Sequence, residues 1–117
     1  MKFGHFHLHS ASVEKTVSFY TDLFELQTLY QDEEGNAFLR DDDGVDFVVS
    51  PLQDGMSVNA ATHIGFKVES VEAVKSLYDK VQGQATVVNE FVDKDGFAIF
   101  SIRDPDNLEV EIYHSPF

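Results

Sequence analysis

The segment DPDNLEVEIY, residues 104–113, joins a turn signal to a strand signal near the end of this 117-residue chain. Proline fixes φ, and Asp and Asn side chains bond to their own backbone, so residues 104–107 are expected to form a turn. The next six residues alternate between the two faces of a strand. The aliphatic face holds Leu108, Val110 and Ile112, and the other face holds Glu109, Glu111 and Tyr113. Burial of the aliphatic face leaves Glu111 either as an ordinary solvated carboxylate or as a residue with partners elsewhere in the chain.

Length and composition limit both the fold and the function classes. The chain has the length of one domain, or of two very small modules with a shared interior. A hydrophobic content of 43% with 11 Phe is sufficient for a packed core. The net charge of −13 argues against a nucleic-acid partner, and no apolar run is long enough to predict a membrane span. The absence of Cys excludes disulfides and thiolate chemistry, and we expect a cytoplasmic protein.

Hydrophobic periodicity predicts eight strands and two helices. Ser12 and Ser70 are expected to be the N-caps of the two helices, which end at Phe24 and Val81. The strands are expected at residues 3–9, 27–31, 37–40, 45–50, 63–67, 86–91, 97–103 and 108–113. Turns are expected at 32–36, 41–44 and 93–96, and a linker at 51–61.

The chain contains an internal duplication. At an offset of 58 the first half matches the second at His5 and His63, Ser12 and Ser70, and Tyr20 and Tyr78. At an offset of 63 the matches are Arg40 with Arg103 and Asp41 with Asp104. We therefore expect one α+β domain made of two tandem βαβββ modules, residues 1–58 and 62–117, whose curved mixed sheets enclose a cleft.

The strand alternation predicts which side chains face that cleft. The aliphatic positions pack under the helices, so the opposite positions face inward: His5, His7, His9, Asp46, Val48, Ser50, His63, Gly65, Lys67, Glu109, Glu111 and Tyr113. Equivalent strands near a pseudo-twofold axis would allow His5, His63 and Glu111 to converge. Two imidazoles and one carboxylate suit Fe(II), and also serve Mn, Zn or Ni.

The chain resembles the vicinal oxygen chelate superfamily, which includes glyoxalase I, extradiol dioxygenases, fosfomycin-resistance enzymes and bleomycin-resistance proteins. The resemblance rests on His5 before SVEKTVSFYTDLF, on the repeat of this arrangement at His63, and on DPDNLEVEIY. It implies the glyoxalase/bleomycin-resistance/dioxygenase fold. It also implies one divalent metal ion (Fe, Mn, Ni or Zn), with His5, His63 and Glu111 as its ligands.

One position departs from the glyoxalase I pattern, which has a further carboxylate on the last strand of the first module. The equivalent position here is Val48, which can neither bind metal nor move a proton, so we do not expect glyoxalase I activity. Candidates for acid–base work are Glu111, His7 and Tyr113. Candidates for ligand contact are His9, Lys67 and Val48. A phosphonate-binding enzyme would need several basic residues at the cleft, and the sequence offers Lys67 and Arg103.

Two function classes follow from these observations. The first is a metal-dependent dioxygenase, lyase or transferase in which the ion chelates vicinal oxygens of a small substrate. The second is a metal-free protein that sequesters a small compound or drug, as bleomycin-resistance proteins do. Relatives of this size generally pair, so we also expect a homodimer with two equivalent clefts, each formed within one chain or across the two.

Overall fold

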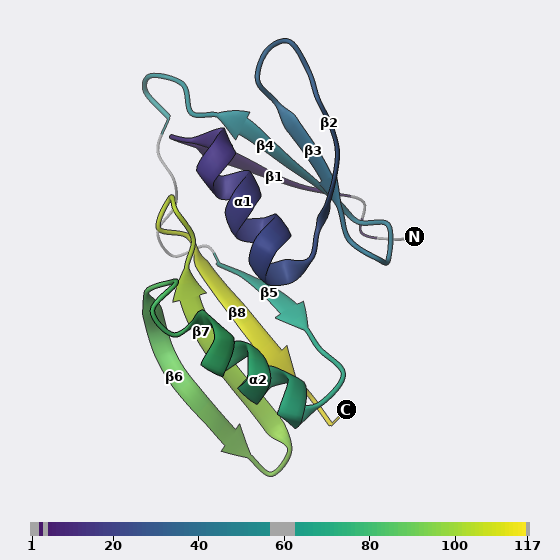
Figure 1. Cartoon of the computed structure of the whole chain (residues 1–117), viewed down its shortest axis with the longest axis vertical. Coiled ribbons are helices and arrows are strands. Elements are labelled where there is room, and N and C mark those ends of the chain that lie inside the picture. Colours follow the sequence, from purple (N-terminus) through teal and green to yellow (C-terminus); the bar gives the residue numbers. More distant parts are fainter. Residues whose placement is uncertain (1–2, 4, 57–62, 117) are drawn as a thin grey trace. The chain divides into compact units, whose positions relative to one another are not determined.

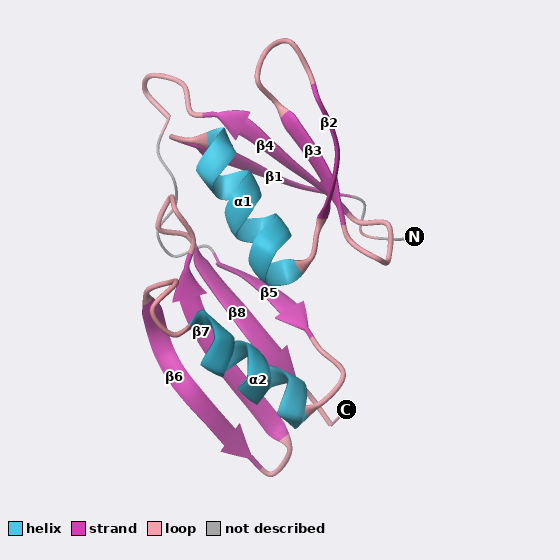
Figure 2. Cartoon of the chain, viewed as in Figure 1, coloured by secondary structure: helices cyan, strands magenta, loops and turns pink. Residues whose placement is uncertain are grey.

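The computed structural model describes residue 3, residues 5–56 and residues 63–116. The chain divides into two compact units, residues 1–58 and 59–117. Each unit contains one four-stranded mixed sheet and one helix (Figure 1). Both units have the element order βαβββ (Figure 2), so the predicted α+β fold of two tandem modules is confirmed. The cleft predicted from the sequence would be lined by both units, and it remains a prediction.

The two units have the same topology. The first contains β1 (His5–Ser10), α1 (Val13–Phe24), β2 (Gln27–Gln31), β3 (Ala37–Arg40) and β4 (Asp46–Pro51), in the sheet order β1-β4-β3-β2. The second contains β5 (His63–Lys67), α2 (Val71–Val81), β6 (Val87–Lys94), β7 (Phe97–Arg103) and β8 (Glu109–His114), in the sheet order β5-β8-β7-β6. In each sheet the first strand pairs in parallel with the last strand, and the other pairs are antiparallel.

Both helices begin where the sequence predicts. The Ser12 hydroxyl accepts a hydrogen bond from the backbone N–H of Lys15 at 3.3 Å, and the Ser70 hydroxyl accepts one from Ala73 at 3.0 Å. Each bond satisfies a donor that the first helical turn leaves without a partner. Neither helix of the described ranges has the length and apolar character needed to cross a membrane.

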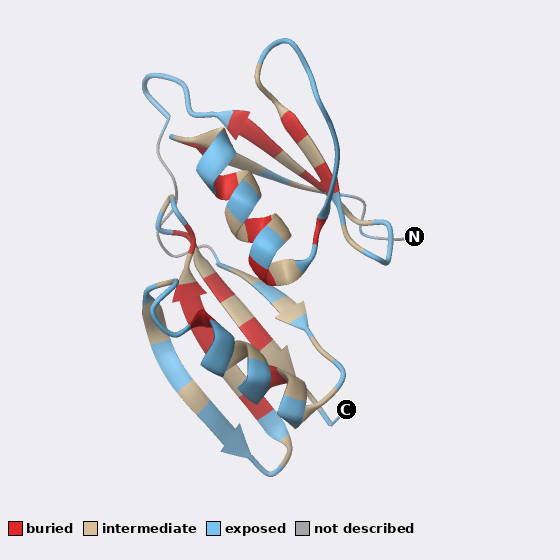
Figure 3. Cartoon of the chain, in the orientation of Figure 1, coloured by how far each residue is buried: buried red, intermediate tan, exposed pale blue. Residues whose placement is uncertain are grey.

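Each sheet buries one face under its own helix (Figure 3). In the first unit Tyr20 and Leu23 are buried on α1, and Ala37, Leu39, Phe47 and Val49 on the sheet. In the second unit Val74 and Val81 are buried on α2, and Ala98, Phe100, Ile102, Val110 and Ile112 on the sheet. Burying each large aliphatic or aromatic side chain stabilises the fold by about 1.5–3 kcal/mol. The opposite sheet faces stay open and carry both polar and apolar side chains.

The second hairpin differs from the prediction. Residues 86–91 and 93–96 were expected to be a strand and a turn, but β6 continues to Lys94. The turn consists of Asp95 and Gly96, with φ values of 53° and 90°. A two-residue turn with positive φ at both positions matches the twist of the flanking strands, which favours the longer pairing. The other strand ends lie within one or two residues of the predicted ones. Residues 57–61 of the predicted linker lie outside the described residues.

The turn before β8 is organised by Asp104, whose residue surface is 6% exposed. Its Oδ1 accepts hydrogen bonds from the backbone N–H groups of Asp106 and Leu108, both at 2.9 Å. Asp41 makes the same two bonds in the first unit, from Asp43 at 3.0 Å and Val45 at 2.8 Å. The matching turns show that the offset of 63 relates equivalent positions.

We expect Asp104→Ala to lower the free energy of unfolding by about 1–3 kcal/mol, because it leaves buried backbone donors without an acceptor. Asp41→Ala is the matched control. It removes the same bonds at a half-buried site where water can replace the carboxylate, so its loss should be smaller. Urea unfolding of the three proteins measures both effects. Equal stability of wild type and Asp104→Ala would contradict this role.

Candidate functional site

The parallel strand pairs determine the neighbours on each open sheet face. Between β1 and β4, His5 pairs with Asp46, His7 with Val48, and His9 with Ser50. Between β5 and β8, His63 pairs with Glu109, Gly65 with Glu111, and Lys67 with Tyr113. Val48 therefore occupies in the first sheet the place that Glu111 occupies in the second, as the sequence offset predicts.

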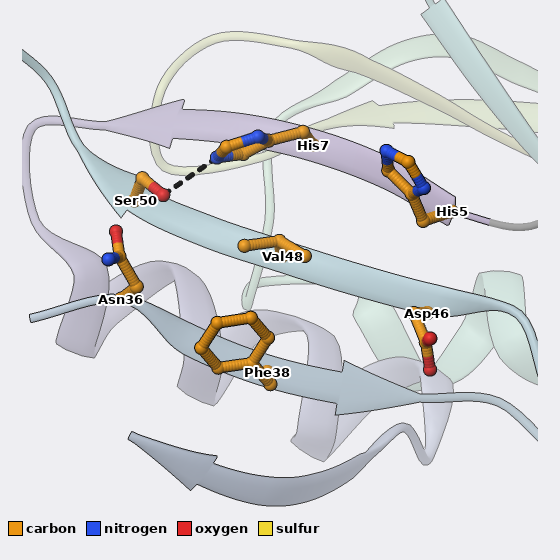
Figure 4. A pocket seen from close by; sticks show the side chains of 7 residues that line it. All are labelled: His5, His7, Asn36, Phe38, Asp46, Val48 and Ser50. Atoms are coloured by element: carbon orange, nitrogen blue, oxygen red, sulfur yellow. Dashed lines mark hydrogen bonds between the residues drawn. The ribbon is translucent and has the colours of Figure 1, made fainter. Parts of the chain in front are cut away.

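The open sheet face of the first unit contains a hollow with a volume of about 410 Å³ (Figure 4). Val48 lies in the middle of the hollow, with His7 on one side and Phe38 on the other. The remaining lining residues are His5, Asn36, Asp46 and Ser50. All belong to the first unit.

His7 is the imidazole with most contacts in this hollow. Its Nε2 lies 2.7 Å from the Ser50 hydroxyl, and its ring stacks on that of His9 at 4.6 Å between centroids. Partial burial lowers the pKa of His7 from 6.5, and charges on His9 and His5 lower it further. The folded state thus binds fewer protons here than the unfolded chain. The resulting contribution to stability is present above pH 6.5 and is lost as the pH falls through the lowered pKa. At neutral pH the ring is mainly uncharged and can accept a proton.

The open face of the second unit has a hollow of about 350 Å³. Its lining residues are His63, Gly65, Phe97, Ile99, Glu111 and Tyr113. A Cβ on Gly65 would lie 3.2 Å from the Tyr113 ring and 3.8 Å from the Cβ of Glu111. The missing side chain therefore lets the Tyr113 ring lie over β5, beside Glu111.

His63 and Glu111 form the closest polar pair of this hollow. The distance from His63 Nε2 to Glu111 Oε1 is 3.3 Å, and the side chains are 52% and 28% exposed. Two ligands that each lie about 2.0–2.2 Å from one ion would be about 2.8–3.6 Å apart at octahedral or tetrahedral angles. This pair therefore has the donor types and the spacing of two ligands of a divalent ion.

The neighbouring carboxylate, Glu109, has a different partner. Asn89 Nδ2 donates to Glu109 Oε2 at 3.3 Å and to Ser101 Oγ at 2.9 Å. The structure thus distinguishes the two acidic residues on this face of β8: an amide holds Glu109, and an imidazole faces Glu111.

A complete ligand set needs a third donor. Within the described ranges, no group of three or more His, Cys, Asp or Glu side chains is gathered as a metal site. His5 occupies the position on β1 that His63 occupies on β5.

Residues 2–112 match the sequence profile of the Glyoxalase/Bleomycin resistance protein/Dioxygenase superfamily. The chain belongs to this superfamily. The resemblance inferred from the sequence is therefore confirmed.

Two curated proteins are similar to this chain. The trivalent organoarsenical cleaving enzyme of Bacillus sp. (strain MD1) is 29% identical over 127 residues, which cover 98% of this chain and 74% of that protein. A probable enzyme of the same name from Bacillus subtilis (strain 168) is 27% identical over 119 residues, covering 98% and 81%.

Solved structures share the fold. The fosfomycin resistance protein of Listeria monocytogenes superposes with a TM-score of 0.83 at 17% identity, covering 100% of this chain and 95% of that one. A possible glyoxalase from Bacillus cereus gives a TM-score of 0.81 at 22% identity, covering 96% and 97%. At these identities the structures show the shared superfamily fold alone.

Most of the site residues predicted from sequence line one of the two hollows. His5, His7 and Val48 lie in the first, and His63, Glu111 and Tyr113 in the second. His9 stacks on His7 beside the first hollow, and Lys67 lies at the end of β5, where it does not line the second.

Sequence reasoning missed further residues of these open faces: Asn36, Phe38, Asn89, Phe97 and Ile99. The alternation of Phe38 with the buried Ala37 and Leu39 was a signal that could have identified it. The alternation in β7, where Phe97 and Ile99 flank the buried Ala98, was a similar signal. Asn36 lies in a turn and Asn89 beside a bulge, where strand parity gives no direction.

Proposed function

We propose that this protein is a divalent-metal-dependent enzyme of the vicinal oxygen chelate type that acts on a small oxygen-bearing substrate. The observation that carries the proposal is the 3.3 Å pairing of His63 and Glu111 on an open sheet face. His5 is the proposed third ligand, because it is the equivalent of His63 in the other module. A bound ion with open positions would polarise substrate oxygens and stabilise negative charge that develops on them.

The chain's own residues supply the proposed proton transfers. His7 is oriented by Ser50 and its lowered pKa keeps it available as a base at neutral pH. Tyr113 lies against Gly65 near Glu111 and can donate a hydrogen bond from its hydroxyl. His9, Lys67 and Val48 remain the proposed ligand-contacting residues.

The two curated relatives are named as a trivalent organoarsenical cleaving enzyme and a probable one, but the present chain lacks the ligand type that suits arsenic. Trivalent arsenic is a soft centre that prefers thiolate sulfur over oxygen and nitrogen donors. The sequence contains no Cys. We therefore propose an oxygen-bearing substrate for a dioxygenase-, lyase- or transferase-type reaction.

The alternative function is metal-free sequestration of a small molecule. The observation that favours it is the first hollow, whose centre is the apolar Val48 and whose wall is the ring of Phe38. The net charge of −13 would attract a cationic compound toward the protein. Metal titration separates the two proposals.

We also propose that the functional unit is a homodimer. The strands β1 and β5 lie at the edges of their sheets, as do β2 and β6. Leu29 and Tyr30 of β2 are 43% and 57% exposed. Uncovered edge strands tend to pair with another chain. Sedimentation of a stable monomer at micromolar concentration would contradict the dimer.

Purified protein should bind about one divalent ion per chain, and His63→Ala should weaken binding by an order of magnitude or more, since two remaining ligands hold an ion poorly. Elemental analysis and titration with Fe(II), Mn(II), Ni(II) and Zn(II) measure this. His63 is exposed, so its removal should leave the fold intact.

His114→Ala is the control variant for this titration. His114 lies on the opposite parity of β8 from Glu111 and contacts the carbonyl of Val68 through Nδ1 at 2.9 Å. Its removal should leave metal affinity unchanged. If wild type and His63→Ala bind every ion equally weakly, the enzyme proposal fails and sequestration replaces it.

Lactoylglutathione lyase activity should be negligible with each of these four metals. The reaction needs a base beside the substrate carbonyl, Val48 cannot act as one, and general acid–base catalysis typically contributes roughly 10²–10⁴-fold. A steady-state assay of the metal-loaded protein tests this. A turnover above about 10 per second, the enzyme median, would show that another residue supplies the base.

A further inference from the structure

The described residues that line the hollow of the first unit include no Lys or Arg. Its described lining consists of two imidazoles, an amide, a hydroxyl, a carboxylate and two apolar side chains. The carboxylate, Asp46, is bound by Arg40 Nε at 2.7 Å, so this guanidinium is already paired. In the metal-free protein, an anionic ligand would therefore lose its hydration here without gaining a Lys or Arg counter-charge.

The centre of the hollow offers a surface for a flat ring. Val48 forms its apolar middle, and the half-buried ring of Phe38 lies beside Val48 (Figure 4). The Phe38 ring is itself stacked on Tyr30, with centroids 4.5 Å apart and an interplanar angle of 14°. A side chain held in this way loses little conformational freedom when a ligand packs on it. Aromatic pairs gain from such stacked or edge contacts beyond their buried area.

Polar groups lie together at one end of this surface. Ser50 and His7 form their hydrogen bond there, and Asn36 lies next to Ser50 (Figure 4). The Asn36 amide nitrogen donates to Asp32 Oδ2 at 2.9 Å, and the Asn36 side-chain oxygen points toward Ser50 (Figure 4). This end of the hollow thus offers an acceptor to an N–H or O–H group at the edge of a ring.

We infer that the open face of the first unit binds a flat, non-anionic ring that carries an N–H or O–H donor, and that this face sets the substrate class. The inference rests on the proposed function, in which the second unit contributes the His63–Glu111 pair to the metal site. In this proposal the first module recognises the ring and contributes His5, and the second module contributes His63 and Glu111. In the metal-free protein, this hollow disfavours rings that carry a phosphonate or a carboxylate substituent.

Four one-ring probes test the inference by NMR titration of the metal-free, ¹⁵N-labelled protein: benzamide, benzylamine, benzoate and phenylphosphonate. Benzamide and benzylamine should shift the backbone signals of Phe38, Val48 and Ser50, with a Kd on the order of 1 mM, as expected for ligands with so few atoms. Benzoate and phenylphosphonate should bind at least about tenfold more weakly, because they bring an unpaired charge into the hollow. Equal or tighter binding of the anions, or no shift with any probe, overturns the inference.

Two variants test where the ring binds. Phe38→Ala should weaken benzamide binding by about fivefold or more, since it removes the ring contact. Phe38→Leu keeps the apolar volume and should weaken binding less, which separates loss of the contact from loss of the fold. Val48→Lys should make benzoate bind about as well as benzamide binds to the wild type, because it adds a cation at the centre. Unchanged affinities in these variants place the ring elsewhere and overturn the inference.

Glu111→Gln separates this inference from the proposed function. It should abolish tight metal binding and leave the benzamide Kd unchanged. Ring binding with no metal binding in any variant defeats the metal proposal alone. Metal binding with no ring binding defeats the substrate inference alone.

Discussion

The parallel pairing of the first and last strands within each unit is the constraint on which the candidate site depends. It joins residues that are more than 40 positions apart in sequence, such as Gly65 and Glu111, and sets them side by side on one face of a sheet. The neighbouring pair, His63 and Glu109, follows from the same register. Because β8 alternates, a slip of one residue would turn Glu111 under α2 and Ile112 outward. The tight turn at Asp104 fixes where β8 begins and so protects this register.

The two open faces share one backbone pairing pattern but carry different side chains. Where the second unit has Glu111, the first has Val48, and where the first has His7, the second has Gly65. The exchange removes a carboxylate from the first face and leaves an apolar centre beside Phe38. It also removes a side chain beside Glu111, so that Tyr113 can lie against β5. The first open face is therefore apolar at its centre, and the second carries an imidazole–carboxylate pair.

The sequence predicted the elements, the duplication and the parity of the open faces, because each depends on local periodicity and capping. The inward positions His7, Val48, His63 and Glu111 all line hollows as strand alternation requires. The bonds of Asn89 to Glu109 and Ser101 could not be predicted, since they cross a bulge between β6 and β7. The stacking of Tyr30 on Phe38 likewise depends on a register shift between β2 and β3. Such shifts depend on packing between strands, which no single segment encodes.

The proposed metal site takes ligands from both modules, and His5→Ala tests this proposal. The measurement is the Mn(II) affinity of this variant beside that of the wild type, with His9→Ala as a control on the same face of β1. The account predicts that His5→Ala weakens binding by an order of magnitude or more, while His9→Ala binds as the wild type does. Wild-type affinity in His5→Ala would contradict the account and confine the metal ligands to the second module.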